Sequence, residues 1–511
     1  MVQQRFGRLG GMLALMAMCC VLVTWVQPLA PLRAAEPTVD LSSEVAGSAT
    51  IGRQKIHYKV TTGRLPVTDK TGKAKSSMFF IAYTRKTDAK PAARPLTFCF
   101  NGGPGSSSSY VHIAAFGPRS ISIDDDGKSI PKPYTLVDNY NSLLDVTDLV
   151  FIDPTSTGYS RAEKDEEAKL FHGVEEDTQS VGQFILSYLD KYDRRVSPTY
   201  IAGESYGTLR AAALSSYLQG RGGVRLNGIM LISTVLDYAT ISFGAGNDLP
   251  NILFLPTYTA AALHHKKLAG DQTKLLSEAE TFANGPYAEA LKKGKALTDD
   301  ERTSIAKSVV KYSGLSEEYI LKVNLRINAG AFRSELLRDS KEVIGRYDSR
   351  VKAKTTGSGK GGLGDPSSAL TSAPMAECLK NYFADDLGIK TDLKYNMTGR
   401  VNPWNFGSPR SKATVVPRLR EAMEKDRSLR VFVACGYCDL ATPFCVAKYT
   451  MSNLGPTVQD RITMSFYEGG HMMYTVKESH QRLKDDMARF ITAPERAPPP
   501  REHWGAATSQ R

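Results

Sequence analysis

The sequence predicts an α/β protein with a mostly parallel central sheet that carries helices on both faces. Several short apolar runs have the length and composition of buried strands. They are residues 96–100, 148–153, 198–202 and 226–232. Helical patterns at 175–189 and 208–214 separate the later runs. Strands that alternate with helices are typical of parallel sheets, and both faces of such a sheet are apolar and must be covered.

The rest of the chain is assigned around this sheet. Residues 48–85 have the alternation of an antiparallel hairpin, which we expect at the sheet's edge. A largely helical stretch then interrupts the rhythm, with patterns at 257–268, 273–284, 299–313, 317–327 and 331–339 and a Gly/Ser/Lys-rich loop at 352–368. Two further strands are predicted at 429–435 and 462–467. The expected organisation is a core in two parts (36–238 and 412–495), an inserted helical cap (239–411) that could shape a substrate cleft, and a disordered Pro-rich tail (496–511).

The composition is that of a soluble globular protein. The 511 residues are 41% hydrophobic and 23% charged, and the formal net charge is +12. The basic residues are spread along the chain without a dense run, which favours a solvated basic surface over nucleic-acid binding.

The N-terminus has the layout of a secretory signal. Arg5 and Arg8 precede an apolar core at 12–26, and small residues follow at Ala30, Ala34 and Ala35. A membrane anchor is the competing interpretation, but the apolar core is short for a membrane span. We expect residues 1–34 to be removed, leaving an exported periplasmic or secreted protein without stable membrane insertion.

Five cysteines lie beyond the predicted signal. They are Cys99, Cys378, Cys435, Cys438 and Cys445. Cys435 and Cys438 have the spacing of a redox pair or of half a zinc site. No second such pair completes four zinc ligands, and redox pairs more often open a helix, whereas this one ends a predicted strand. We therefore expect bystander cysteines or an incidental disulfide, and neither a metal nor a cofactor.

The strongest motif is Gly-Glu-Ser-Tyr-Gly at 203–207. It follows a predicted strand and opens a helical pattern, the context of a nucleophile elbow that exposes Ser205 above the sheet. A second glycine-rich loop, Asn-Gly-Gly-Pro-Gly at 101–105, follows an earlier strand. It is either a tight turn or, with Ser205 present, the source of an oxyanion-hole donor.

A serine nucleophile needs a base and an acid that orients the base. His471 follows the last predicted strand in a Gly-Gly loop, and Asp439 follows the strand before it. The chain order Ser205, Asp439, His471 is the order used on a sheet of this kind. Singly, Asp439 could be a turn former and His471 an ordinary loop histidine.

Together these motifs resemble the serine carboxypeptidase family, most closely its bacterial members. The resemblance rests on Asn-Gly-Gly-Pro-Gly at 101, Gly-Glu-Ser-Tyr-Gly at 203 and Gly-His-Met at 470, and it covers about residues 50–490. It implies an α/β-hydrolase fold. It also implies an oxyanion hole from the amides of Gly103 and Tyr206, and binding of a peptide's C-terminal carboxylate by Asn101 and Glu204. Peptides with a free C-terminus are then the expected substrates.

Three positions depart from the family pattern. A second glutamate of the family is replaced by Ala115, a usual cysteine by Ser106, and a common glycine by Ser156. The loss at Ala115 bears on carboxylate affinity and pH optimum. The alternatives are an esterase or acyltransferase on the same scaffold, since an acyl-enzyme can also pass to an alcohol, and a catalytically silent binding protein.

Overall fold

The computed structural model describes residues 41–88, 90–355 and 364–493. These residues belong to one compact unit. The predicted signal (1–34) and tail (496–511) lie outside them. Within the described residues, no helix combines the length and apolar character needed to cross a membrane.

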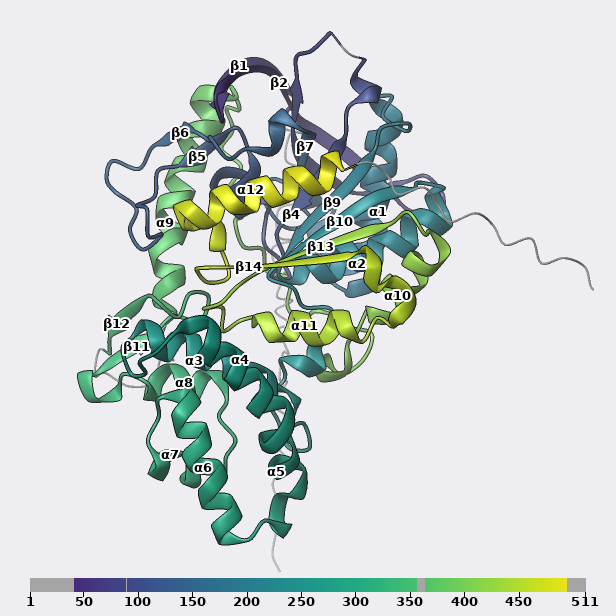
Figure 1. The fold of residues 1–511 in the computed structure, drawn as a ribbon. Helices are drawn as coiled ribbons and strands as arrows, with labels where there is room; N and C mark the ends of the chain where they lie inside the picture. Colours follow the sequence, from purple (N-terminus) through teal and green to yellow (C-terminus); the bar gives the residue numbers. More distant parts are fainter. Residues whose placement is uncertain (1–40, 89, 356–363, 494–511) are drawn as a thin grey trace, which may run out of the picture. The chain divides into compact units, whose positions relative to one another are not determined.

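The main sheet has the strand order β1-β2-β3-β7-β4-β9-β10-β13-β14, with β8 paired to β3. Figure 1 shows the strands β9, β10, β13 and β14 side by side. Its strands are β1 (Ser43–Ile51), β2 (Gln54–Thr68), β3 (Ala74–Arg85), β4 (Leu96–Phe100), β7 (Asp148–Ile152), β8 (Arg161–Ala162), β9 (Thr199–Glu204), β10 (Leu226–Ile232), β13 (Arg430–Gly436) and β14 (Ile462–Tyr467). A separate small pair is formed by β5 (Arg119–Ile121) and β6 (Leu136–Asp138).

The sheet is parallel from β7 to β14 and antiparallel at one edge. The pairs β7/β4, β4/β9, β9/β10, β10/β13 and β13/β14 are parallel, whereas β1, β2, β3 and β7 pair antiparallel. The predicted mostly parallel sheet is therefore confirmed, and the expected edge hairpin is β2 and β3, extended by β1. Parallel strands place their carboxyl ends at one edge, so the loops after β4, β9, β13 and β14 meet there.

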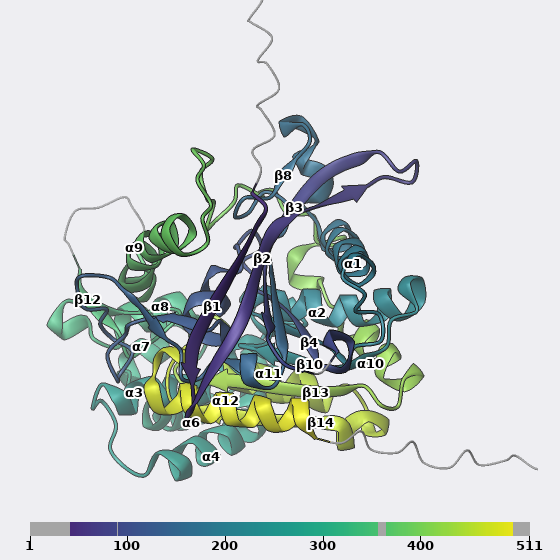
Figure 2. The ribbon, with the colours of Figure 1, turned by 90° about the horizontal axis from the view of Figure 1, so that it is seen from above.

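Helices cover both faces of this sheet (Figure 2). On one face, α1 (Val174–Lys191), α2 (Tyr206–Tyr217) and α10 (Val416–Lys425) share a buried cluster with Ile201 and Val431. On the other face, α12 (Lys477–Thr492) lies across the C-terminal strands, where Phe490 packs 5.8 Å from Phe432. Each central strand is thus buried on both sides, which explains its mostly apolar sequence.

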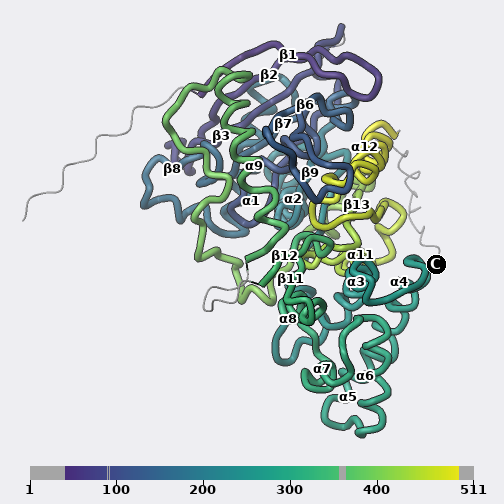
Figure 3. The backbone as a smooth tube through the Cα atoms, turned by 90° about the vertical axis from the view of Figure 1, so that its left-hand side faces the viewer, coloured from purple at the N-terminus to yellow at the C-terminus, as the bar shows by residue number. Residues whose placement is uncertain are grey.

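The chain between β10 and β13 is largely helical, and Figure 3 shows its first helices together beside α11 (Phe444–Ser452). Before α10, which packs on the sheet, the helices are α3 (Leu249–His264), α4 (Gln272–Phe282), α5 (Ala288–Lys293), α6 (Asp299–Ser313), α7 (Glu317–Lys322), α8 (Ala329–Glu335) and α9 (Pro366–Asn381), with a small hairpin of β11 (Glu342–Ile344) and β12 (Lys352–Lys354). Helices α3 to α8 bury a hydrophobic cluster that includes Phe254, Tyr258 and Phe332, and Leu440 and Val446 from beyond β13 join it. Their role as a cap over a cleft stays a prediction.

Local chemistry explains why the predicted ends of some of these helices match the structure and others do not. Helix α6 begins as predicted because Thr298 and Glu301 form a capping box. Helix α3 starts earlier than expected because the helix continues through Pro256, a residue that normally ends one. Helix α7 stops at Lys322, since Asn324 and Leu325 both have positive φ. Helix α9 was not predicted.

Candidate active site

Ser205 stands at a strained turn between β9 and α2. Its φ is 59° and its ψ is −127°, a backbone conformation that non-glycine residues rarely adopt. The turn is closed by direct backbone packing. A Cβ on Gly203 would lie 2.2 Å from the carbonyl oxygen of Gly207, and one on Gly102 would lie 2.4 Å from the amide nitrogen of Tyr206. Glycine is therefore required at 203 and 102, and the turn presents Ser205 to a cavity of about 300 Å³.

Asp439 and His471 are brought together by the loops after β13 and β14. His471 Nδ1 donates to Asp439 Oδ2 at 2.7 Å, and both side chains are buried. The other carboxylate oxygen of Asp439 accepts the amides of Ala441 at 2.7 Å and Thr442 at 3.0 Å. His471 and Ser205 line the same cavity. Between described residues, no hydrogen bond joins the Ser205 hydroxyl to His471.

The two groups shift each other's pKa. Burial alone would raise the pKa of Asp439, but His471 and the hydrogen bonds from Thr442 outweigh burial and hold it below its usual value. Burial alone would lower the pKa of His471, but the facing Asp439 carboxylate outweighs it and raises that pKa. An ionised Asp439 fixes the proton on Nδ1, which leaves Nε2 as the basic nitrogen of the ring.

Three residues that the sequence did not single out hold this pair in place. The Thr442 hydroxyl donates to Asp439 Oδ2 at 2.7 Å. The His471 amide donates to the Tyr347 carbonyl at 2.5 Å, and the Ser233 hydroxyl donates to the His471 carbonyl at 2.6 Å. Thr442 could have been suspected from its place three residues after Asp439. No sequence motif around Ser233 or Tyr347 indicates that either residue contacts His471.

The predicted oxyanion-hole residues, Gly103 and Tyr206, both line the cavity. Gly103 has a φ of 100°, and Tyr206 is the first residue of α2. Neither amide has a hydrogen-bond acceptor among the described residues. The first amides of a helix point outward and favour negative charge, so Tyr206 is well placed to stabilise an anion.

Asn101 and Glu204 are in direct contact at the base of the same cavity. Asn101 Nδ2 donates to Glu204 Oε1 at 2.9 Å, and the Tyr474 hydroxyl donates to Glu204 Oε2. The Asn101 Oδ1 atom accepts the amides of Tyr110 and Val111 at 3.0 and 3.1 Å, which fixes the orientation of its amide. Burial raises the pKa of Glu204, and the opposing contributions of His471, Tyr474 and Asn101 do not cancel it.

A buried ion pair lies beneath these residues. Arg210 Nε contacts Asp177 Oδ2 at 2.7 Å, and both side chains are at most 3% exposed. A second nitrogen of Arg210 donates to the Asn101 carbonyl at 2.8 Å, and the Tyr206 hydroxyl donates to Asp177 at 3.3 Å. The pair therefore ties the elbow helix to α1 and to the loop after β4.

The three departures from the family pattern lie in different surroundings. Ala115 is fully buried, and its carbonyl accepts hydrogen bonds from Asn139 and His480 at 2.8 Å each. Ser106 lines the cavity. Ser156 has a φ of 75°, which explains why glycine suits this position, and its hydroxyl lies 2.9 Å from His172 Nε2.

Cys435 and Cys438 are buried free thiols, as are the other three cysteines of the described residues. An incidental disulfide, one of the two expectations for the pair, is therefore absent from this part of the chain. Burial raises the pKa of each thiol to about 12, which disfavours the reactive thiolate. No group of three or more possible metal-binding side chains occurs among the residues described.

A mostly parallel sheet covered on both faces, with a serine elbow after one strand and an aspartate–histidine pair after the last two, defines an α/β hydrolase. A family model described as serine carboxypeptidase matches residues 52–484. The chain belongs to the serine carboxypeptidase family.

Individual relatives are more distant. The chain is 31% identical over 135 residues to the pheromone-processing carboxypeptidase KEX1 of Saccharomyces cerevisiae, a match covering 25% of this chain and 17% of the relative. It is 25% identical over 226 residues to serine carboxypeptidase-like 1 of Arabidopsis thaliana, covering 42% and 48%. These matches thus span less than half of each relative. The crystal structure of Saccharomyces cerevisiae Kex1(Δ)p, a prohormone-processing carboxypeptidase, superposes with a TM-score of 0.51 at 16% identity, covering 85% of this chain and 91% of that one.

Proposed function

We propose that this protein is a serine-type carboxypeptidase that releases C-terminal amino acids from peptides through an acyl-enzyme. Ser205 is the nucleophile, His471 the general base and acid, and Asp439 the group that orients His471. The amides of Gly103 and Tyr206 form the oxyanion hole. Family membership supports the proposal, as does the cavity that Ser205, His471, Gly103 and Tyr206 line together, with Asp439 hydrogen-bonded to His471.

The reaction has two halves. The Ser205 oxygen bonds to the carbonyl carbon of the last peptide bond while His471 Nε2 takes the hydroxyl proton. His471 gives that proton to the leaving nitrogen, the C–N bond breaks, and the terminal amino acid departs. Water then attacks the Ser205 ester, its proton passes to His471 and on to the Ser205 oxygen, and the shortened peptide leaves. The two amides stabilise the oxyanion formed in each half.

The observation that carries the proposal is the buried Glu204 carboxyl, which reaches the cavity beside Ser205 and is hydrogen-bonded to Asn101. A buried carboxyl with a raised pKa is readily protonated and can share its proton with a second carboxylate, which a peptide C-terminus supplies. A peptide amide lacks that carboxylate and leaves the site's polar groups mispaired, at about 1–3 kcal/mol.

The test compares free-acid peptides with their amides from about pH 4 to about pH 8. Acids should be hydrolysed about 10-fold or more faster at low pH, since 1.4 kcal/mol is a factor of ten. The advantage should shrink as pH rises, because Glu204 and the substrate both become charged. Glu204→Gln should flatten this dependence while hydrolysis continues. Equal rates for acid and amide at every pH would point instead to an esterase or acyltransferase.

We further propose that the helices after β10 act as a cap over the cleft, and that residues 1–34 direct export and are then removed. The basic start, the apolar core and the small residues near Ala34 support export. The mass of the protein recovered from the cell envelope and the medium tests it. A chain that keeps its N-terminus in the membrane fraction would contradict the proposal.

A further inference from the structure

The cavity that contains Ser205 adjoins a second one of about 650 Å³. The two share four lining residues, Ile241, Arg346, Arg410 and Ala441. Beyond this border the second cavity is lined mainly by the helical segment between β10 and β13, including Phe243 and Phe254, whose rings pack 4.8 Å apart. The two adjoining cavities together are called the extended cleft below. The arginine pair, Arg346 and Arg410, lies at the border between them.

Arg346 is held firmly at this border. Its amide donates to Asp365 Oδ1 and its carbonyl accepts the Leu440 amide, both at 3.0 Å. Its guanidinium lies 5.0 Å from the centre of the Tyr347 ring, which in turn lies 5.1 Å from the His471 ring. The Tyr347 ring therefore lies between the Arg346 guanidinium and His471, the proposed base.

Arg410 reaches the same place from the other end of the helical segment. Its guanidinium lies 5.0 Å from the Tyr238 ring and 5.7 Å from the Phe406 ring. Burial raises the pKa of Tyr238, and the charges of both Arg410 and Arg346 oppose that rise. Both guanidinium groups are therefore close enough to act on one phenol.

Neither guanidinium has an ion-pair partner among the described residues. The carboxylate of Asp365 accepts the backbone amide of Arg346, not its guanidinium. Among the lining residues of the two cavities, Glu204 carries a carboxyl group, and this group is buried and already hydrogen-bonded to Asn101 and Tyr474. Two uncompensated positive charges in a concave site attract a negatively charged ligand group.

The direction of the substrate follows from the proposed function, on which this inference rests. Asn101 and Glu204 line only the first cavity, and the terminal residue of a peptide lies between them and Ser205. The acyl part of the peptide must then leave in another direction. The second cavity lacks Asn101, Glu204 and Ser205 and borders the first at the arginine pair, so it offers a path to the acyl part.

We propose that Arg346 and Arg410 select peptides with an acidic side chain on the acyl side of the cleaved bond, at the penultimate residue. The substrates are then peptides with a free C-terminus and Glu or Asp as the penultimate residue.

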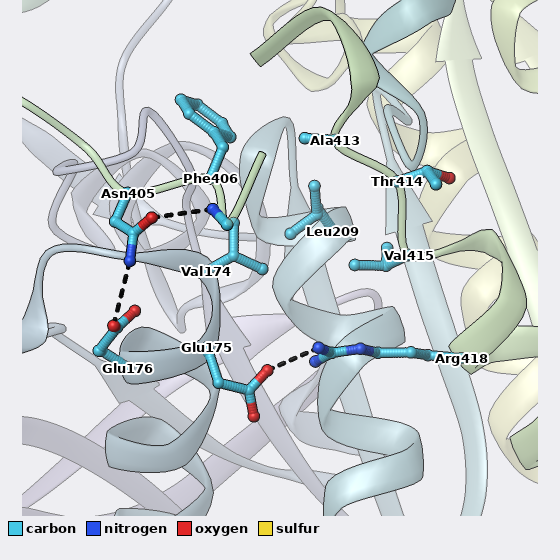
Figure 4. Close-up of a pocket in the computed structure, with 11 residues that line it drawn as sticks. Val174, Glu175, Glu176, Leu209, Asn405, Phe406, Ala413, Thr414, Val415 and Arg418 are labelled. Carbon is cyan, nitrogen blue, oxygen red and sulfur yellow. Dashed lines mark hydrogen bonds and ion pairs between the residues drawn. The ribbon is translucent and has the colours of Figure 1, made fainter. Parts of the chain in front are cut away.

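A matched control is available in a separate cavity of about 220 Å³ between α1, α2 and α10 (Figure 4). There Arg418 pairs with Glu175 at 2.6 Å. Arg418 lines neither part of the extended cleft. Arg418→Gln removes the same charge from the molecule without touching the proposed substrate path.

The experiment measures kcat/KM for blocked tripeptides ending in Leu, with Glu, Gln or Lys as the penultimate residue, at about pH 6, where a Glu side chain is ionised. Wild type should prefer Glu over Gln by about 10-fold and disfavour Lys, and about 0.5 M NaCl should reduce both effects. The preference should fall in Arg346→Gln and Arg410→Gln and vanish in the double variant. Because the charge of Arg346 also lowers the pKa of His471, each variant is judged by its own Glu-to-Gln rate ratio, and Arg418→Gln should keep the wild-type ratio.

Equal rates for Glu and Gln peptides in wild type would overturn the inference and leave the carboxypeptidase proposal intact. So would a preference for Glu at the terminal position, or one that survives the double variant. If no peptide is hydrolysed, the proposed function fails instead. Nitrophenyl esters of blocked Glu and Gln then test the arginines separately, because they present the same acyl side without a terminal carboxylate.

Discussion

The hydroxyl of Tyr474 gives a sharp test of how Glu204 works. Tyr474 donates to Glu204 Oε2, and both side chains are at most 4% exposed. A donated hydrogen bond favours the ionised carboxylate, and this contact opposes the rise that burial imposes on the pKa of Glu204. Tyr474→Phe removes the donor and keeps the ring, so the pKa of Glu204 should rise further.

The size of the effect follows from the difference between two hydrogen bonds. A bond to a charged group contributes about 1.5–3 kcal/mol and one to a neutral group about 0.5–1.5, so Tyr474→Phe should make protonated Glu204 easier to form by about 1–1.5 kcal/mol. At near-neutral pH the rate ratio of free-acid peptide to amide should therefore increase by up to about 10-fold. At acidic pH, where Glu204 is already protonated, the ratio should hardly change.

The assay is kcat/KM for a matched acid and amide peptide across the pH range. Rates on the acidic side should still rise with pH, because a protonated His471 cannot accept the Ser205 proton and the pKa of His471 is raised. Tyr382→Phe is the control, since it removes another buried hydroxyl, which lies 2.8 Å from that of Tyr83 and outside the cavity. An acid-to-amide ratio at neutral pH that is unchanged or lower in Tyr474→Phe would refute this account of Glu204.

Three further outcomes are expected. Ser205→Ala and His471→Ala should each lower kcat by about 10⁴-fold or more, and the double variant should be little worse, because the residues act as a unit; additive losses in steady-state kinetics would contradict this. Thr442→Val should lower kcat by about 10-fold with little change in KM, because one hydrogen bond to the orienting carboxylate is lost. Arg210→Met should lower the free energy of unfolding in urea by about 3–5 kcal/mol, since it strands the buried carboxylate of Asp177; a loss below about 1 kcal/mol would show that the pair contributes little.

The sequence by itself determined the sheet and the elbow. Strands such as β4, β7, β9 and β10 are buried on both faces, so each is a short, mostly apolar run that can be recognised without its neighbours. The turn at Ser205 needs glycines at fixed positions relative to the serine, and such a short motif can be recognised from the sequence. Asp439 and His471 could be selected because parallel strands end at one edge, so a residue just after a strand is placed there whatever its distance along the chain.

Only the tertiary structure decided what surrounds these residues. Glu204 and Tyr474 are separated by 270 positions, and no short-range pattern connects them. The same holds for Arg346 and Arg410, which reach the cleft from a loop and from a three-residue 3-10 helix, both too short to show a periodic pattern. Helix α3 continues through Pro256 because its tertiary packing outweighs the local preference of proline, and α9 carries an internal proline as well. Local steric rules act between near neighbours and can be read from sequence, whereas burial and charge depend on which distant segments the fold brings together, and that information exists only in three dimensions.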